Sequence, residues 1–363
     1  MGDRFSVEPE TMGVLSEAER AIAALNARAD PALQPLARLL LRTESIASSK
    51  VEGLQVDARG LARAEARRDL GGRVGAEGLE VLANVDAMQL AVEEAAAEPA
   101  LERSHVLGIH AALLVGAPAM TTPGRVRQVQ NWIGGNDYTP CGADFVPPPP
   151  EEVEPLLDDL IAFCAADDLP PLLQAALAHA QFETIHPFAD GNGRTGRALI
   201  HVLLRRRDLA PSYVPPISVV LARDRAGYIA GLESFREGRI DEWVERFCAA
   251  AAESAVLANA YLDAVGRLQD DWRAAVTAEG APRSDSAVWA VIEVLPAQPV
   301  ISVPVATAAT GRSKPTVNDA VAILQRAGVL IPLSDARRNR SWEARGLLDL
   351  LTALEEGRPM TRR

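Results

Sequence analysis

Apolar residues recur every three or four positions along most of this chain, which is the spacing of amphipathic α-helices. Helices are expected on this basis over residues 12–28, 31–45, 81–97, 102–115, 151–166, 172–185, 195–207, 224–235 and 241–265. Asp30-Pro31 is expected to cap the second of them. The pattern breaks over residues 118–150, where strand-type residues such as Val126, Trp132 and Ile133 stand between turn signals. A short β-hairpin inserted among helices is therefore predicted there.

A different pattern begins after residue 265. Residues 265–283 are polar and are expected to form a connector. Beyond them, helices are expected over 285–295, 303–310 and 315–327, an extended piece over 299–301, and two strands over 329–333 and 341–342 around a basic turn. This order resembles a winged helix-turn-helix domain, a class in which the third helix enters the major groove of DNA.

Composition narrows the functional classes. The chain has 363 residues, enough for two or three domains, and a net charge of −12, which argues against nonspecific binding of the whole molecule to nucleic acid or to an anionic membrane. Its three cysteines form no CxxC pair, so the sequence predicts neither a disulfide framework nor a zinc site. There is no secretory signal region and no apolar run near 18 residues, so a soluble, cytoplasmic protein is expected, with no membrane partner.

The strongest candidate chemistry lies in residues 181–197. His186 can accept a proton near neutral pH, and Pro187 should end the preceding helix so that the histidine projects from a loop. Asp190 is a hard oxygen ligand of the kind that Mg²⁺ accepts alongside phosphate oxygens.

The following residues suit a polyphosphate. Gly191, Asn192 and Gly193 can turn backbone N–H groups inward at the start of a helix, and both features favour anions. Arg194 and Arg197 share one helical face and can reach phosphate oxygens. The same glycines satisfy the spacing of a Rossmann dinucleotide site, but that site requires a preceding strand, and a helix is expected here.

The stretch from His186 to Arg197, HPFADGNGRTGR, resembles the complete signature of Fic-domain proteins, HPFx[D/E]GNGRxxR. The resemblance implies an all-helical Fic core that transfers AMP from ATP to a Ser, Thr or Tyr hydroxyl of a target protein, or of itself, and releases pyrophosphate. It also implies roles for individual residues. These are His186 as the base, Phe188 as the anchor of the loop, Asp190 as the Mg²⁺ ligand, Gly191, Asn192 and Gly193 as contacts of the α- and β-phosphates, and Arg194 and Arg197 as contacts of the outer phosphates.

An upstream motif complements this signature. Alone, Ser48-x-x-x-Glu52-Gly53 describes a surface serine and glutamate on a helix that ends at a glycine. Beside the signature, it resembles the inhibitory motif of the family, [S/T]xxxE[G/N]. A Glu52 carboxylate paired with Arg197 would occupy the guanidinium that otherwise fixes the γ-phosphate, so an autoinhibited enzyme is expected.

We therefore expect an all-α protein in three parts. Residues 1–95 would form an N-terminal helical region with the inhibitory motif, residues 96–265 the Fic catalytic core with its hairpin flap, and residues 284–350 a winged-helix-like domain. The flap would dock the target protein through an exposed strand edge. Mg²⁺ is the expected cofactor and ATP the expected substrate.

Several readings stay open from sequence alone. Glu52 could instead position a water that removes AMP from modified targets. The chain could be a transcriptional regulator in which the Fic core senses nucleotide and the winged helix binds DNA. Transfer of another nucleotide or of phosphocholine and assembly into a homodimer are further options.

Overall fold

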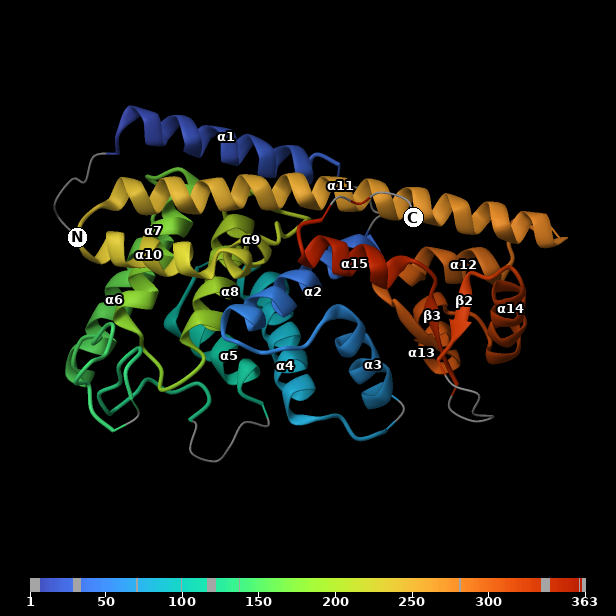
Figure 1. The fold of residues 1–363 in the computed structure, drawn as a ribbon, viewed down its shortest axis with the longest axis horizontal. Helices are drawn as coiled ribbons and strands as arrows, with labels where there is room; N and C mark the ends of the chain where they lie inside the picture. Colours follow the sequence, from blue (N-terminus) through green and yellow to red (C-terminus); the bar gives the residue numbers. More distant parts are fainter. Residues whose placement is uncertain are drawn as a thin grey trace.

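Helices dominate this protein, as its computed structural model shows (Figure 1). The structure describes residues 7–28, 34–69, 71–98, 100–115, 122–136, 138–280, 282–333, 340–358 and 360, so the expected cap at Asp30-Pro31 lies outside the described residues. The N-terminal and central helices are α1 (Pro9–Asn26), α2 (Gln34–Val51), α3 (Ala58–Asp69), α4 (Ala76–Leu90) with a π-helical continuation η2 (Ala91–Ala95), α5 (Arg103–Leu113), α6 (Pro150–Ala165), α7 (Pro171–Ile185), α8 (Asn192–Arg206), α9 (Ile217–Arg223), α10 (Arg225–Arg236) and α11 (Ile240–Gly280). The remaining elements are α12 (Ala287–Val294), η3 (Leu295–Ala297), β1 (Val300–Ser302), α13 (Val303–Thr310), α14 (Lys314–Arg326), β2 (Leu330–Pro332), β3 (Ser341–Ala344) and α15 (Leu347–Glu355).

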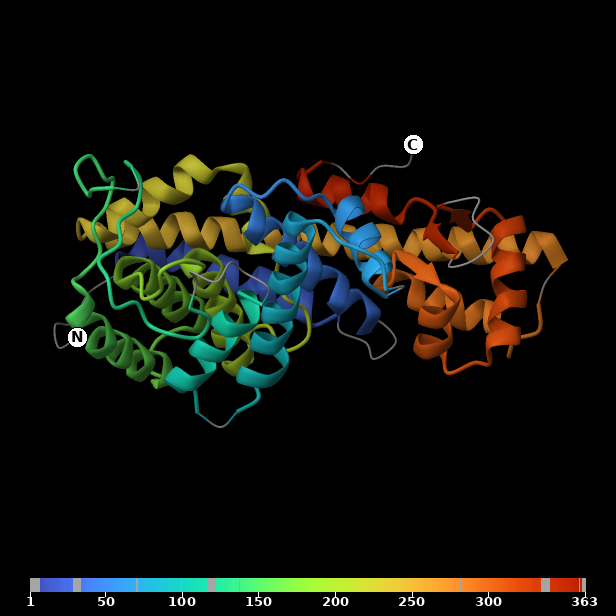
Figure 2. The same cartoon turned by 90° about the horizontal axis from the view of Figure 1, so that it is seen from below.

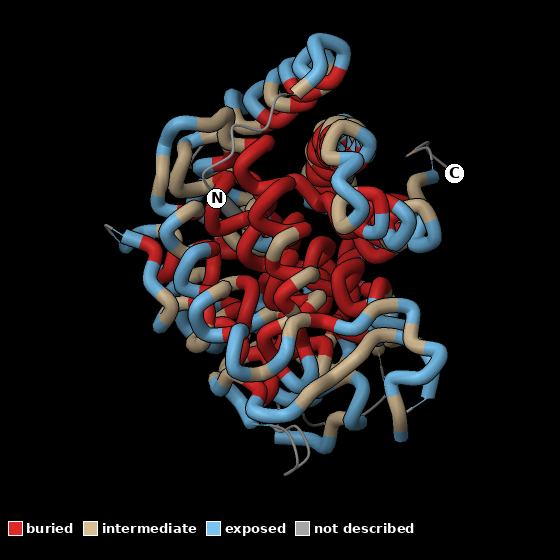
Figure 3. Tube along the Cα trace, turned by 90° about the vertical axis from the view of Figure 1, so that its left-hand side faces the viewer, coloured by how far each residue is buried: buried red, intermediate tan, exposed pale blue. Residues whose placement is uncertain are grey.

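Helices α7 and α8 form the centre of the core. Nearly every residue of α7 is buried, because α6, α8, α10 and α11 surround it. Helix α8 is buried over most of its length between α7, α5, α2 and η2. Viewed along its long axis, the molecule has its buried residues at the centre, between the helices, and its exposed residues at the periphery (Figure 3). The turn between α7 and α8, which carries the His186 signature, is thus held between two well-packed helices.

Helix α11 corrects one expectation. Residues 265–283 were expected to form a connector, but α11 continues without interruption from Ile240 to Gly280, over 41 residues. The reason is that Gln269, Trp272 and Val276 keep one face buried at helical spacing, although the other positions are polar. The helix runs along the whole molecule, with α1 packed against its first half and α15 and α12 against its second half (Figures 1 and 2).

The flap, which was expected to form a short β-hairpin, contains a single pair of bridged residues in its described part. Among the described residues 122–136 and 138–149, Ile133 and Phe145 form one antiparallel bridge, and the rest is irregular. Prolines at 147–149 cannot donate ladder hydrogen bonds, and positive φ at Gly134, Gly135 and Gly142 turns the chain away from extended geometry.

A small module follows α11. Helices α12, α13 and α14 pack on one another, with α13 against β1 and α14 against β2. The strands form an antiparallel sheet in the order β1-β3-β2, in which Ile301 and Pro332 lie opposite Trp342 on its two sides. Residues 334–339, most of the basic turn, lie outside the described part. Helix α15 was not expected, although Leu347, Leu351 and Leu354 lie on one helical face and are buried.

Candidate active site

His186 occupies the C-terminal end of α7. Its backbone is left-handed, with φ 49° and ψ 61°, a conformation that non-glycine residues adopt only when the surroundings enforce it. Arg127 supplies this constraint: its Nε donates to the His186 carbonyl at 2.9 Å, and its backbone N–H donates to the Pro187 carbonyl at 2.9 Å. The histidine therefore leaves the helix end at a fixed angle, in the place where Pro187 predicted the helix to stop.

The imidazole of His186 is held in its neutral form. Burial lowers its pKa to about 4, and the nearby charge of Arg127 acts in the same direction. A backbone contact with Glu183 acts in the opposite direction without outweighing burial. The ring is therefore neutral at physiological pH, with a nitrogen that can accept a proton.

Phe188 and Asn192 fix the loop that follows. The Phe188 side chain is fully buried and stacks on His110, with ring centroids 3.7 Å apart. The Asn192 side chain accepts from the Phe188 N–H and donates to its carbonyl, both at 2.8 Å. In this structure the Asn192 amide group thus holds the loop closed on itself, and the backbone N–H groups of the first turn of α8 are left to face an anion.

His110, from α5, is a site residue that the motif did not reveal. Its Nδ1 accepts from the Gly124 N–H at 3.0 Å, so its Nε2 carries the proton and donates to the Asp190 carbonyl at 3.0 Å. Burial lowers the pKa of His110 to about 4, which keeps the ring neutral in this bridging role. No sequence pattern relates His110 to Asp190, so the contact between them could not be predicted from the sequence.

The turn at 191–193 leads into the first turn of α8. Residues 191–194 and Arg197 are together called the phosphate cradle here. Gly191 is left-handed at φ +77°, and α8 begins at Asn192, so three residues earlier than expected. Gly193 is needed for space: a Cβ there would overlap Oε1 of Glu52 and approach Nη1 of Arg197 to 2.9 Å. The Glu52 carboxylate thus lies directly on the cradle.

Arg197 joins the cradle to α2. It is 1% exposed, its Nε donates to Ser48 Oγ at 2.9 Å, and its Nη2 donates to the Ser48 carbonyl at 2.8 Å and to Glu52 Oε1 at 2.6 Å. Burial opposes the ionisation of Glu52, but the charge and hydrogen bond of Arg197 outweigh it, so the pKa of Glu52 is lowered. The Glu52 side chain remains 38% exposed, so it reaches the cradle from the solvent side.

Arg194 has an acidic partner as well. Its Nη1 lies 2.6 Å from Oε1 of Glu80 on α4, and its Nη2 lies 3.9 Å from Oδ1 of Asp190. Glu80 belongs to another helix, and nothing in its sequence neighbourhood indicated this contact. Asp190 exposes 58% of its side chain beside the cradle, a setting that fits a hard cation shared with phosphate oxygens and water. Within the described residues, no group of three or more His, Cys, Asp or Glu side chains is arranged to hold a metal by itself.

A buried polar layer lies beneath the cradle. Burial raises the pKa of Glu183 to about 7, and its Oε1 lies where a Cβ on Gly196 would approach it to 2.7 Å. His179 Nε2 is 2.8 Å from the hydroxyl of Tyr228, which is 5% exposed and packs against Trp243. Tyr228 is therefore a core residue in this structure.

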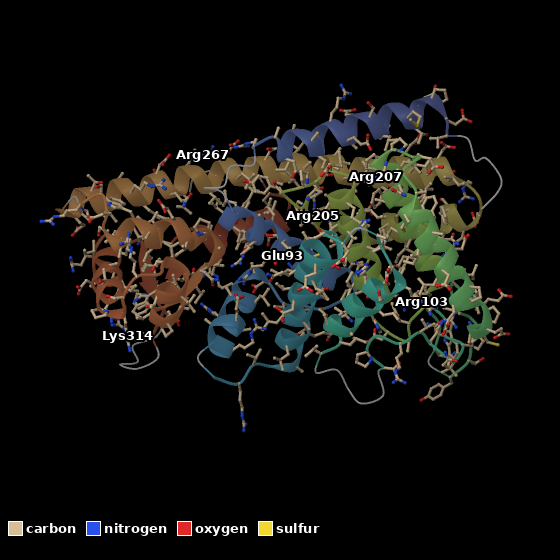
Figure 4. The ribbon with its side chains drawn as sticks, turned by 180° about the vertical axis from the view of Figure 1, so that it is seen from behind. Glu93, Arg103, Arg205, Arg207, Arg267 and Lys314 are labelled. Atoms are coloured by element: carbon tan, nitrogen blue, oxygen red, sulfur yellow. The ribbon has the colours of Figure 1, made fainter. Side chains whose placement is uncertain are left out.

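Three basic side chains outside the site lie on separate helices. Arg103, Arg267 and Lys314 lie on α5, α11 and α14, far apart along the molecule (Figure 4). Arg205 lies in the last turn of α8, where a cation complements the helix dipole. Among the described residues, no helix combines the length and the apolar character needed to cross a bilayer.

Comparison with known proteins agrees with this geometry. Residues 100–204 match the Fic/DOC family, and residues 12–93 match the Fic/DOC family N-terminal region. A protein adenylyltransferase Fic of Nematostella vectensis is 32% identical over 160 residues, which are 43% of this chain and 33% of the relative. A probable protein adenylyltransferase of Aquifex aeolicus is 34% identical over 106 residues, 29% of this chain and 31% of the relative. The matched region thus spans about a third of the length of these relatives.

The fold extends further than the sequence similarity. A Fic family protein from Desulfovibrio desulfuricans superposes with a TM-score of 0.56 at 20% identity, over 95% of this chain and 99% of the other. Fic-1 of Caenorhabditis elegans superposes with a TM-score of 0.54 at 21% identity, over 70% of this chain and 73% of the other. The chain is accordingly a member of the Fic/DOC family and a distant homologue of Fic protein adenylyltransferases.

Proposed function

We propose that this protein transfers AMP from ATP to a hydroxyl group of a protein and that Glu52 restrains this activity. The observation that carries the proposal is that a neutral His186 and the cradle adjoin, while the Glu52 carboxylate lies on Gly193 and bonds to Arg197 at 2.6 Å. An acidic group occupies the place that a phosphate would take.

The reaction follows from these positions. His186 accepts the proton of the target hydroxyl, the hydroxyl oxygen bonds to the α-phosphorus of ATP, and the bond from this phosphorus to the bridging oxygen breaks. Pyrophosphate leaves, and the target carries an adenylyl group through a phosphodiester. The first-turn N–H groups of α8 bind phosphate oxygens, and Arg194 and Arg197 fix the outer phosphates. When bound, Mg²⁺ would neutralise phosphate charge, and Asp190 is the residue that would hold it.

Restraint by Glu52 has a direct physical cause. While its carboxylate holds Arg197, the γ-phosphate lacks a partner and meets a like charge at Gly193. ATP that enters is then turned away from in-line geometry, and orientation supplies much of the catalysis of phosphoryl transfer.

The flap is the proposed docking surface for the target. Val129 and Tyr138 are 75% and 93% exposed beside the Ile133–Phe145 bridge, so an extended segment could contact them. We include the C-terminal module in the proposal only as a winged-helix-like unit. Its α14 begins at the exposed Lys314 and then exposes Thr316, Asn318 and Asp319, rather than the several cations that a DNA-binding helix would carry.

The test uses ATP labelled at either end. The Glu52→Gly protein, incubated with cell lysate, should incorporate label from the α-position and none from the γ-position, and mass spectrometry should find adenylyl adducts. The double variant Glu52→Gly/His186→Ala should lose the labelling by about 10²-fold or more, since a positioned base contributes at least that much. Labelling from the γ-position would show phosphate transfer instead, and faster release of AMP from a modified target by the wild type than by Glu52→Gly would show AMP removal.

A further inference from the structure

The segment that carries Glu52 is only partly buried: Leu54 and Val56 contact the core, and its other residues are exposed. Residues 52–57 connect α2 to α3, and every one of them is exposed or only half-buried. Three backbone hydrogen bonds, from Glu52, Gly53 and Leu54 back to the end of α2, define the turn.

The Gln55 N–H also donates to Glu77 Oε1 of α4, and Arg225 Nε donates to the Val51 carbonyl, both at 2.8 Å. The contacts that hold the two ends of this exposed segment add to these bonds in placing it over the cradle.

The end before Glu52 is tied to the C-terminal helix. Lys50, on the last turn of α2, places its Nζ 2.7 Å from Oε2 of Glu355, the last residue of α15. The Glu355 side chain is only 2% exposed, so its carboxylate has little access to water in place of the lysine. The separation of 305 residues shows that α15 returns from the far end of the chain to make this contact.

The end after Glu52 is tied to the same module. Arg59, on the first turn of α3, bonds through Nη1 to Glu343 Oε1 of β3 at 2.5 Å and through Nη2 to Asp349 Oδ1 of α15 at 2.9 Å. A guanidinium that bridges two carboxylates from different elements fixes both distance and angle. Helix α15 also packs on α2 and α3, beside the Glu52 turn (Figures 1 and 2).

We infer that the C-terminal module holds the Glu52 turn over the phosphate cradle through these two flanking ion-pair sites, so that Lys50, Arg59 and Glu355 are positioning residues for inhibition. The inference rests on the proposed restraint by Glu52. It follows that any ligand or partner that draws α15 and β3 away from α2 and α3 raises nucleotidyl transfer, without touching the nucleotide.

The charges at these two contacts, together called the clamp, hold the turn in place by attraction. The module contributes only carboxylates to these contacts, and the α2–α3 side contributes only cations. Opening would separate opposite charges at both ends of the turn at once, while the buried pairing of Glu44 with His201 and Ser218 keeps α2 itself anchored on α8 and α9. The turn can therefore move without loss of the helix that carries it.

The test removes each of these ion pairs by substitution in the full-length protein. The variants are Lys50→Met, Glu355→Gln and Arg59→Met. The matched control is Arg28→Met, which breaks the ion pair between Arg28, just after α1, and Asp263 of α11. Two quantities are measured for each: amide hydrogen exchange over residues 52–57 and the initial rate of AMP incorporation. Each clamp variant should exchange faster there and transfer AMP on the order of fivefold faster, a common size for coupling between sites; the control should match the wild type.

Two further sets of variants distinguish a positioning role of these residues from a general loss of stability. In a Glu52→Gly background the clamp substitutions should give no further increase, because the group that they position is gone. The exchanged pair Lys50→Glu/Glu355→Lys should restore slow exchange and low transfer. Unchanged exchange in folded clamp variants, or equal rate increases with and without Glu52, would overturn the inference. If Glu52→Gly itself does not raise transfer, the proposed restraint fails, and the exchange measurement alone then decides whether the module holds the turn.

Discussion

At the scale of single residues, the three glycines of the signature meet three different needs. Gly191 provides a left-handed turn, Gly193 makes room for the Glu52 carboxylate, and Gly196 lets α8 approach α7. A sequence pattern typical of dinucleotide sites thus serves helix packing here, because the element before it is a helix.

Gly196 allows a direct check of this account. A Cβ there would lie 2.7 Å from Glu183 Oε1 and 2.9 Å from Phe182 Cδ1, so Gly196→Ala should lower the free energy of unfolding by roughly 1–3 kcal/mol. Gly266, within α11, has nothing within 4 Å of the same position, so Gly266→Ala should raise stability by up to about 1 kcal/mol. Urea unfolding of both variants measures the contrast, and equal effects of the two substitutions would refute the proposed close packing.

Buried histidines make stability depend on pH. Burial lowers the pKa of His179 from 6.5 to about 3, so between pH 6.5 and that value the unfolded chain binds a proton at this residue that the folded chain does not. Stability is therefore lost as pH falls through this window, by about 1.4 kcal/mol per pH unit for this one group. Glu183 acts in the opposite sense, because burial raises its pKa from 4.5 to about 7 and the folded chain takes up the proton first.

His179→Gln isolates this contribution. Glutamine can still bond to the Tyr228 hydroxyl, so the variant should fold. Between pH 6.5 and 5, its free energy of unfolding should fall less steeply with decreasing pH than that of the wild type. The difference in slope should correspond to the uptake of about one proton on unfolding. Chemical unfolding at a series of pH values provides the slopes. Parallel slopes would mean that His179 does not titrate differently in the two states.

At the scale of elements, sequence periodicity located most helices and the signature located the loop between α7 and α8. Sequence periodicity failed to predict the second half of α11. Polar residues such as Asp270 and Asp271 are frequent there, and the face that is buried is covered by α12 and α15, which come later in the chain. Periodicity also missed Glu80 and His110 as neighbours of the cradle, because these contacts join separate helices and leave no local pattern. Winged-helix character of the module and the roles of the site residues stay predictions.

The continuity of α11 is open to test. Ala274 is exposed within it, and proline there removes a helix hydrogen bond and clashes with the preceding turn. Ala274→Pro should therefore cost about 3 kcal/mol of stability, whereas Ala274→Ser should cost a few tenths. A connector at this position would tolerate proline, so equal thermal midpoints for the two variants would contradict the uninterrupted helix.

At the scale of the whole molecule, three distant parts of the chain converge on one helix end. The signature contributes the cradle, α2 contributes Ser48 and Glu52, and the C-terminal module contributes the carboxylates that flank the Glu52 turn. Helix α11 spans the distance between the core and the module, so that α15 can reach back to α2 (Figure 1). The central claim is that one carboxylate competes with a phosphate for Arg197.

The most direct test of this claim is the initial rate of AMP incorporation from labelled ATP by wild type, Glu52→Gly and Glu65→Gln. Glu65 is a matched control, since its carboxylate also pairs with an arginine of α2, Arg42, without touching the cradle. We predict a rise of at least 10-fold for Glu52→Gly, equivalent to about 1.4 kcal/mol of recovered transition-state binding, and a wild-type rate for Glu65→Gln. An unchanged rate for folded Glu52→Gly that still binds ATP would contradict the account.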